Sequence, residues 1–390
     1  MRLGIVGGRL QGTEAAYLGA EAGYEVVLVD RAAGVPGAGL AAEVHILDVT
    51  ADEGASRAIL ETCDVVLPCC ENLATLRWLD ERLPLWGIPY AFHMPSYTLS
   101  SSKLRSNRLL AALDVPRPLP WPECGFPVVV KPSGASGSEG VRRASDPEAL
   151  ESARGALEAQ GHEVVVQEFV DGPSLSLEVM SDGRRAKVLL PTSLEFDETY
   201  DCKRVTAPVE APSALLEAFA AAGRRIAEGL GLWGIMDIEV MVDGLEPKVI
   251  EIDARLPSQT PTCVYHSCGV NMVEVLCRLA VDRRLPDIAL GFRAACVYQH
   301  VRVGGGAVQV LGEHVMAGAG PLRKREGFFG VDVALTDYVP GATGWVATLV
   351  TLGPDVGSAR EAAADAVERI ARDGGLTLLP ESVPRVGVEW

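Results

Sequence analysis

The chain has 390 residues, more than one ordinary hydrophobic core organises, so two or three domains are expected. Its 52 acidic residues outnumber 35 basic ones and give a formal net charge of −17. This acidity argues against nucleic acid or an anionic membrane as a partner, because there is no surplus of basic side chains to displace counterions.

The cysteines and the apolar segments indicate a cytoplasmic protein. The nine cysteines include no CxxC pair, so reduced and mostly buried thiols are expected. No apolar run reaches about 18 residues, the length from which a membrane-spanning helix is suspected. We therefore expect a soluble, cytoplasmic protein that has no membrane partner.

Strands and helices alternate over residues 1–95, the first predicted domain. Apolar segments with the length of strands, and helical patterns between them, are found as follows: strands at 2–7, 25–30, 64–68 and 88–92, and helices at 14–21 and 73–83. Apolar strands that alternate with helices predict a parallel, doubly wound α/β sheet.

Two loops in this domain follow predicted strands. The first has the glycine spacing GGxxxG, with Asp30 about 20 residues beyond it, and differs from the GxGxxG spacing typical of nicotinamide sites. Open α/β sheets bind ligands at the carboxyl ends of strands, so both loops are candidate substrate contacts. Helix-capping turns are the alternative interpretation. The candidate residues are Leu10, Gln11, Glu71 and Asn72, of which Glu71 suits an ammonium group.

The second predicted unit, residues 96–175, contains a candidate phosphate site. An apolar strand ends in Lys131 and continues into a Gly/Ser loop over 133–140. Such a loop offers backbone N–H groups and hydroxyls to a phosphate, and the lysine adds positive charge. Lys103, at the start of a predicted helix, is a second phosphate cation. A surface hairpin and a solvent-facing lysine are the alternatives. The loop contacts are Ser133, Ser138 and Gly140.

A further strand of this unit ends in a segment that suits a nucleotide base. Glu168, Phe169 and Val170 can present backbone groups to an adenine edge, with the carboxylate near the amino group or the ribose. Glu178, on the following strand, is a candidate ribose contact. Neither segment is specific by itself.

The third predicted unit, residues 176–390, contains two acidic strands. Asp237 and Glu239 alternate with apolar residues, as do Glu251 and Asp253. Side chains alternate along a strand, so each pair points one way, and neighbouring strands would gather the carboxylates. Such a cluster needs cations, and hard oxygen ligands favour Mg²⁺ held together with substrate phosphates. Half-exposed strands with acidic outer faces are the alternative.

Two polar stretches lie near these strands in the sequence. An acidic loop over 195–203 contains Glu198 and Asp201 and suits an amine-bearing substrate; a solvated loop is the alternative. Arg255 and Ser258 directly follow the second acidic strand and offer donors beside the expected metal.

The order of these features resembles the ATP-grasp carboxylate–amine ligases. Asp253 stands where an asparagine is usual in that superfamily, which keeps an oxygen ligand. Longer segments are similar to the family of 3-methylornithine–L-lysine ligases of pyrrolysine biosynthesis: 6–12, 71–73, 197–202 and 250–262.

The resemblance implies a fold and a set of cofactors. The fold is an α/β ATP-grasp fold with an N-terminal Rossmann-like (pre-ATP-grasp) domain, a small α/β lid subdomain and a C-terminal α+β domain with the metal-binding strands. ATP and two Mg²⁺ ions are expected. The implied metal ligands are Glu239, Glu251 and Asp253, and the implied ATP contacts are Lys103, Lys131, Ser133, Ser138, Gly140, Glu168, Phe169, Val170 and Glu178.

The resemblance also implies a reaction. ATP phosphorylates the carboxylate of (3R)-3-methyl-D-ornithine, and the ε-amine of L-lysine attacks the acyl phosphate. Lys131 and Arg255 are the implied catalytic residues. The implied substrate contacts are Leu10, Gln11, Glu71, Asn72, Glu198, Asp201, Arg255 and Ser258. A homodimer contact and packing over the substrate cleft are equal expectations for the last ninety residues.

Three other functions stay open from the sequence. The first is an ATP-grasp ligase for another pair, such as D-alanine with D-alanine. The second is a nicotinamide-dependent oxidoreductase that uses the first domain. The third is a nucleotide-binding protein without catalytic activity.

Overall fold

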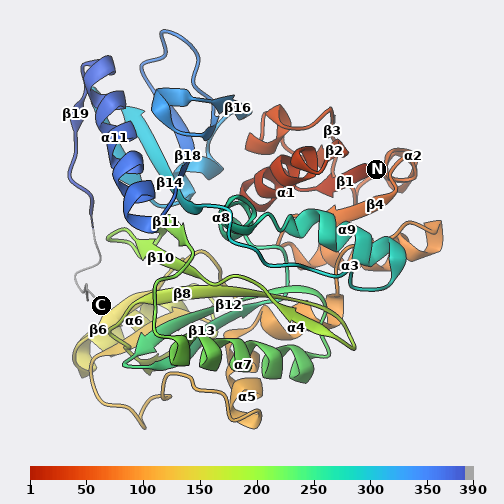
Figure 1. Cartoon of the computed structure of the whole chain (residues 1–390). Helices are drawn as coiled ribbons and strands as arrows, with labels where there is room; N and C mark the ends of the chain where they lie inside the picture. Colours follow the sequence, from red (N-terminus) through yellow and green to blue (C-terminus); the bar gives the residue numbers. More distant parts are fainter. Residues whose placement is uncertain (383–390) are drawn as a thin grey trace. The chain divides into compact units, whose positions relative to one another are not determined.

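The computed structural model describes residues 1–382, which divide into two compact units (Figure 1). Unit 1 consists of Met1–Met94, Lys203–Pro208 and Leu256–Ser382, and unit 2 of Pro95–Cys202 and Val209–Arg255. The domain boundaries predicted at residues 95 and 175 stay predictions.

Unit 1 begins with a four-stranded parallel sheet in the order β3-β2-β1-β4. Its strands are β1 (Arg2–Val6), β2 (Glu25–Asp30), β3 (Glu43–Ile46) and β4 (Val65–Pro68), and its helices are α1 (Leu10–Glu21), α2 (Glu53–Leu60) and α3 (Leu73–Arg82). The predicted parallel α/β sheet is confirmed.

The strand predicted over 88–92 is wrong. Tyr90 forms only an isolated bridge to Val66 of β4. Pro89 has no N–H group, so this apolar run cannot donate a continuous ladder of hydrogen bonds, although Pro89 O accepts from Val66 N at 2.9 Å.

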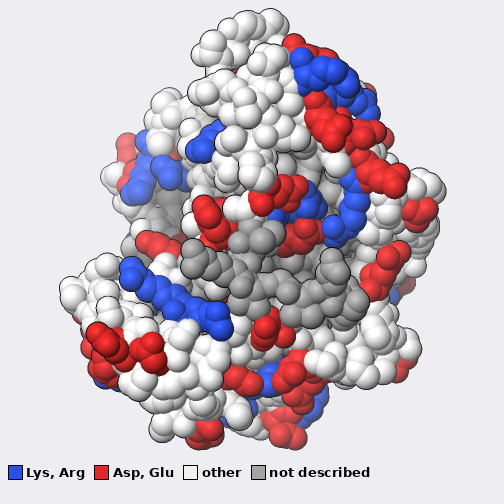
Figure 2. Space-filling model, turned by 90° about the vertical axis from the view of Figure 1, so that its left-hand side faces the viewer, with Lys and Arg blue, Asp and Glu red and all other residues white. Residues whose placement is uncertain are grey.

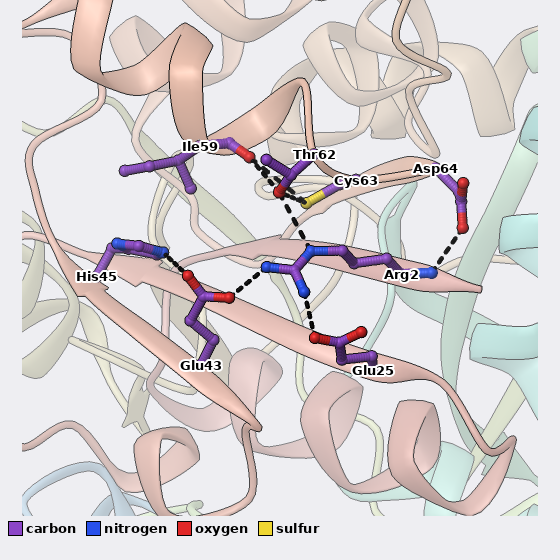
Figure 3. A network of polar contacts seen from close by, with 8 residues as sticks. All are labelled: Arg2, Glu25, Glu43, His45, Ile59, Thr62, Cys63 and Asp64. Atoms are coloured by element: carbon purple, nitrogen blue, oxygen red, sulfur yellow. Dashed lines mark hydrogen bonds and ion pairs between the residues drawn. The ribbon is translucent and has the colours of Figure 1, made fainter.

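A polar network joins the amino ends of the parallel strands (Figure 3). The guanidinium of Arg2, on β1, contacts the carboxylates of Glu25 on β2 and Glu43 on β3. Arg2 Nε also donates to Thr62 Oγ1 at 3.1 Å, and its backbone N–H donates to Asp64 Oδ2 at 2.7 Å. The network joins the strands at their amino ends, whereas ligands bind at the carboxyl ends of the strands in such folds.

The rest of unit 1 contains a mainly antiparallel sheet in the order β11-β14-β18-β17-β16, with β15 beside β14 and β19 beside β15. The strands are β11 (Cys202–Ala207), β14 (Ala295–Gly304), β15 (Ala307–Leu311), β16 (Arg323–Glu326), β17 (Val333–Thr336), β18 (Trp345–Gly353) and β19 (Thr377–Leu378). The helices are α8 (Thr260–Cys268), α9 (Met272–Asp282), α10 (His314–Ala317) and α11 (Val356–Gly374). Val367 and Ile370 of α11 pack against Leu349 of β18 in the core of this part.

Unit 2 contains a small and a large antiparallel sheet. The small sheet has the order β6-β5-β7, and the large sheet contains β13-β12-β8-β10, with β9 beside β8. Their strands are β5 (Val128–Pro132), β6 (Arg142–Ala144), β7 (Val164–Glu168), β8 (Ser174–Asp182), β9 (Ala186–Val188), β10 (Thr192–Phe196), β12 (Trp233–Asp243) and β13 (Glu246–Asp253). The helices are α4 (Met94–Ser100), α5 (Lys103–Ala112), α6 (Pro147–Glu158) and α7 (Ser213–Leu230).

Helix α7 covers one face of the large sheet (Figure 1). Leu215, Phe219 and Ile226 recur at helical spacing, are fully buried, and pack with Leu177 of β8 and Ile238 of β12. Because strand side chains alternate, the residues between these apolar positions point to the opposite face of the sheet.

No helix within residues 1–382 combines the length and the apolar character that crossing a membrane requires. On the face drawn in Figure 2, lysine and arginine side chains form small groups between acidic and neutral ones. This mixture agrees with the acidic composition of the chain.

Candidate active site

The acidic strands of unit 2 are neighbours, as their sequence predicts. β12 pairs antiparallel with β13, so that Asp237 lies opposite Asp253 and Glu239 opposite Glu251. On the other side of β12, Glu178 of β8 lies opposite Asp237. Directly opposed residues share a face of a sheet, so these five carboxylates, here called the acidic row, lie on the face opposite to the one that α7 covers.

Burial makes this group of carboxylates electrostatically unfavourable. The pKa of Asp237 is raised to about 6, first by burial and then by Glu251, although Ser176 and Arg255 oppose the shift. The pKa of Glu239 is raised well above its usual value by burial, and then by Asp237 and Glu251. Burial and the repulsion between neighbouring carboxylates therefore favour the protonated forms of Asp237 and Glu239.

Metal ligation is not preformed at these carboxylates. Within residues 1–382, no three His, Cys, Asp or Glu side chains are arranged so that they could hold a metal ion. Two basic side chains contact the acidic row instead: Lys103 Nζ lies 2.6 Å from Glu251 Oε1, and Arg255 Nη2 lies 2.7 Å from Asp253 Oδ2.

Both predicted phosphate lysines lie beside β13. Lys103 is the first residue of α5, and its Nζ also donates to Ala135 O of the Gly/Ser loop at 2.5 Å. Lys131 Nζ donates to Ile250 O at 2.9 Å. Burial lowers the pKa of Lys131 to about 8, while Glu251 raises it and Lys103 lowers it further. Two lysines that are 28 residues apart in sequence therefore contact adjacent residues of β13, Glu251 and Ile250.

The Gly/Ser loop is fastened to the start of α5 by Ser133. Ser133 O accepts from Lys103 N at 2.8 Å, and its hydroxyl accepts from Leu104 N at 3.3 Å. Farther along the loop, Ser138 and Gly140 have φ values of 58° and 73°. Ser133 thus has a structural contact, while the loop beyond it turns through the left-handed backbone region that favours glycine.

The predicted adenine segment is fixed through Glu168. The Glu168 carboxylate lies 2.9 Å from Lys248 Nζ and accepts from Leu119 N at 3.0 Å. Arg143 lies over the ring of Phe169, with its guanidinium carbon 4.6 Å from the ring centroid, and Val170 is buried. The sequence interpretation missed Lys248, whose signal was a lysine within an otherwise apolar stretch of β13.

Glu178, which the sequence analysis names as a candidate ribose contact, belongs to the acidic row. Its side chain is fully buried, and β8 places it opposite Asp237. A role at the ribose stays a prediction.

The acidic loop between β10 and β11 is shaped by Asp197. Its Oδ1 accepts from Thr199 N at 2.8 Å and from Asp201 N at 3.2 Å, and Tyr200 has a φ of 65°. Asp201 is buried, whereas Glu198 is exposed.

The remaining predicted substrate contacts belong to unit 1. Leu10 and Gln11 are the first residues of α1, which begins earlier than predicted, and Gln11 Nε2 donates to Leu256 O at 3.3 Å. Asn72 caps α3 by accepting from Thr75 N, and Glu71 is exposed. Ser258 Oγ donates to Glu313 Oε2 at 2.8 Å.

Two acidic side chains of unit 1 accept hydrogen bonds from backbone N–H groups of other segments. Asp30 Oδ2 accepts from Gly8 N at 2.7 Å, so this carboxylate closes the glycine loop. Glu14 of α1, which the sequence interpretation missed, is 1% exposed and accepts from Thr262 N at 2.6 Å. Burial raises the pKa of Glu14 to about 7, although Thr262 lowers it.

Comparison with known proteins agrees with this arrangement. A family profile described as an ATP-grasp domain matches residues 100–259. The 3-methyl-D-ornithine–L-lysine ligase of Methanosarcina barkeri is 37% identical over 314 residues, which cover 80% of this chain and 83% of that protein. The ligase of the same name from Methanosarcina mazei is 34% identical over 315 residues, which cover 80% and 81%.

Solved structures show the same fold at low sequence identity. Biotin carboxylase of Campylobacter jejuni aligns with a TM-score of 0.73 at 16% identity, over 94% of this chain and 91% of that chain. The biotin carboxylase domain of Hydrogenobacter thermophilus 2-oxoglutarate carboxylase, crystallised with MgADP, aligns with a TM-score of 0.70 at 17% identity, over 90% and 86%.

The fold and the relatives define the class as ATP-grasp enzymes that join a carboxylate to an amine. Within this class, the chain belongs to the family of 3-methyl-D-ornithine–L-lysine ligases.

Proposed function

We propose that the protein joins the carboxylate of (3R)-3-methyl-D-ornithine to the ε-amine of L-lysine, at the expense of ATP, in pyrrolysine biosynthesis. The observation that supports this most is the meeting of Lys103 and Lys131 with the acidic strands in unit 2. The relatives that share this family supply the substrate pair.

The donor set fits Mg²⁺. Glu239, Glu251 and Asp253 offer oxygen ligands on one face of the sheet, and their crowding favours a divalent cation in that place. When bound, Mg²⁺ would neutralise charge on the ATP phosphates. Two ions are predicted for this site. The carboxylates would exchange their contacts with Lys103 and Arg255 for the metal.

The lysines and the Gly/Ser loop are placed for phosphate binding. Lys103 and Lys131 would turn from Ala135 O and Ile250 O toward the phosphates, and the backbone around Ser138 would add N–H donors. The ornithine carboxylate oxygen attacks the γ-phosphorus, ADP leaves, and an acyl phosphate forms. Positioning and charge neutralisation are the main contributions of the protein to such a transfer.

Amide formation needs a neutral amine and a stabilised leaving group. The ε-amine of lysine has a pKa of about 10.4 in water, so a carboxylate that binds its ammonium form has to take a proton. Glu71 and Asp201 are the candidates for this role. The amine then attacks the acyl carbon and inorganic phosphate leaves, while Arg255 stabilises negative charge on the tetrahedral intermediate.

A product assay tests the proposal. The protein, ATP, Mg²⁺, L-lysine and 3-methyl-D-ornithine, or D-ornithine in its place, are incubated and analysed by mass spectrometry. We expect an amide-linked product together with ADP and phosphate. Omission of ATP is the control. Condensation of D-alanine with D-alanine, and none of the expected amide, would support the rival ligase.

The nicotinamide alternative is disfavoured by Asp30. In nucleotide sites of that kind the corresponding carboxylate binds a ribose hydroxyl. In this chain both oxygens of Asp30 accept backbone hydrogen bonds instead, from Gly8 N in the glycine loop and from Ala32 N directly after β2. Tight NADH binding in a fluorescence titration, without a response to MgATP, would reverse this ranking. A cytoplasmic location and a homodimer stay predictions.

A further inference from the structure

A pair of basic residues in β11 binds a carboxylate from the far end of the chain. Lys203 Nζ lies 3.0 Å from Glu381 Oε2 and donates to Ser382 O at 2.7 Å. Arg204 Nη2 lies 2.5 Å from the other carboxylate oxygen, Glu381 Oε1. All four of these residues belong to unit 1.

Both basic side chains are buried in the folded chain, and Arg204 is also held by residues outside the C-terminal segment. The side chains of Lys203 and Arg204 are 2% and 13% exposed, while that of Glu381 is 38% exposed. Arg204 Nε donates to Gln299 Oε1 at 2.9 Å, and Gln299 Nε2 donates to Ala363 O at 3.1 Å. β14 and α11 therefore hold the guanidinium in place, independently of the C-terminal segment.

This arrangement has the chemistry of a carboxylate-binding site. An ammonium and a guanidinium that contact the two oxygens of one carboxylate give charge-assisted hydrogen bonds, which are stronger than neutral ones. Burial also makes a Lys203 ammonium without an anion costly. A carboxylate is thus the ligand that the pair selects, whether it comes from Glu381 or from a small molecule.

The proposed reaction involves an amino acid that needs such a site. The α-carboxylate of L-lysine does not react and has to be recognised by positive charge. Lys103, Lys131 and Arg255 have roles at the phosphates and the acyl group in the proposed mechanism, and Lys248 holds Glu168. The carboxylate of the ornithine substrate, before it is phosphorylated, is the second possible source.

We propose that Lys203 and Arg204 form a binding site for the carboxylate of an amino-acid substrate, and that Glu381 occupies this site as an intramolecular competitor. This inference rests on the proposed function for the identity of the amino acid. An alternative role for the same contacts is a purely structural tie that fixes the C-terminal segment.

Substitution of Glu381 distinguishes the two roles. In the full-length Glu381→Gln variant, competition predicts that L-lysine binds about three- to tenfold more tightly, because the competent fraction of the site rises. The KM for the same amino acid falls and kcat is unchanged. A structural tie predicts a lower melting temperature with unchanged affinity. Glu361→Gln, at an exposed position of α11, is the matched control.

The ligand itself supplies the second arm of the experiment. Calorimetric titration compares L-lysine with L-lysinamide, and D-ornithine with D-ornithinamide, on wild type, Glu381→Gln and Lys203→Met. We expect Lys203→Met to bind one of the acids at least about tenfold more weakly, the loss that follows from removing a charge-assisted contact of about 1.4 kcal/mol or more. Binding of the corresponding amide is expected to be unchanged. The acid that responds identifies the source of the carboxylate.

Two results would overturn the inference. One is equal acid and amide affinities in wild type and in Glu381→Gln; the other is a loss of stability in Glu381→Gln without tighter binding. These binding measurements do not need turnover. Wild-type protein that discriminates lysine from lysinamide through Lys203 but forms no amide product would contradict the proposed function and leave this site supported.

Discussion

At the scale of single residues, charge compensation determines what the acidic row of unit 2 can do. Asp237 and Glu239 are buried and have raised pKa values, while Lys103 forms an ion pair with Glu251 and Arg255 forms one with Asp253. Addition of MgATP brings both a divalent cation and a polyanion. The carboxylates would then contact the cation, and the lysines would contact the phosphates.

Glu251→Gln tests this use of the row. We expect turnover to fall at least about 100-fold, which is the usual effect of removing one preorganised electrostatic contact at a transition state. The fold is expected to survive, as measured by circular dichroism and thermal unfolding. Glu246→Gln, at the exposed start of the same strand, is the control. Full activity of Glu251→Gln would refute the role of this carboxylate.

Glu14 makes the stability of unit 1 depend on pH. Its pKa is about 7 in the folded chain against a reference value of 4.5, because burial disfavours the charged form. The folded state therefore holds a proton that the unfolded state releases, and stability falls as pH rises from 4.5 through 7. We expect Glu14→Gln to gain about 3 kcal/mol over wild type between pH 4.5 and 8.

Urea unfolding at pH 5 and pH 8 measures this gain for Glu14→Gln and for an exposed control, Glu361→Gln. The control is expected to differ from wild type equally at both pH values. A Glu14→Gln difference that is also independent of pH would contradict the raised pKa.

At the scale of elements, the helix α7 and the strands β8 and β12 form the support of the site. Phe219 is fully buried between them. Phe219→Ala is expected to cost about 3–5 kcal/mol, from lost burial and the cavity left behind. Leu245→Ala, at a position that is 57% exposed in the turn between β12 and β13, is expected to change stability little. Equal losses in both variants, measured by denaturant unfolding, would show that α7 does not support the sheet.

The Gly/Ser loop is connected to the acidic row through one side chain. Lys103 bridges Ala135 O and Glu251, so Lys103→Met should free the loop in the absence of nucleotide. We expect faster amide hydrogen exchange over 134–140 in this variant, since exchange reports local opening. Lys187→Met, on β9, serves as the control. Unchanged exchange in Lys103→Met would contradict the bridging role.

Local sequence patterns predicted those elements whose signals are local. The acidic strands could be predicted because alternation of carboxylates with apolar residues needs only a few positions. The start of α1 was missed because Arg9 provides no side-chain cap hydrogen bond, so no capping signal marks it. β3 was missed because Glu43 and His45 interrupt its apolar character.

Contacts between distant parts of the chain were not predictable from such patterns. Lys248 and Glu168 are 80 residues apart, and Glu14 and Thr262 are 248 residues apart. No local spacing indicates that a carboxylate will be buried against a partner so far along the chain. The same reason explains why Lys203, Arg204 and Glu381 were not recognised together.

At the scale of the whole molecule, the account joins the fold, the relatives and the chemistry. The relatives establish the family, and the parallel sheet of unit 1 and the two sheets of unit 2 agree with the ATP-grasp neighbours. An acyl phosphate is the step on which the proposed roles of Lys103, Lys131 and Arg255 depend, because each serves phosphoryl transfer or its product.

An isotope experiment tests that step most directly. Turnover is run with D-ornithine whose carboxylate carries ¹⁸O, and the released phosphate is analysed by mass spectrometry. The account predicts one ¹⁸O atom in each phosphate, because the carboxylate oxygen that attacks the γ-phosphorus leaves with it. Amide product accompanied by unlabelled phosphate would contradict the acyl phosphate and, with it, the mechanism assigned to the site.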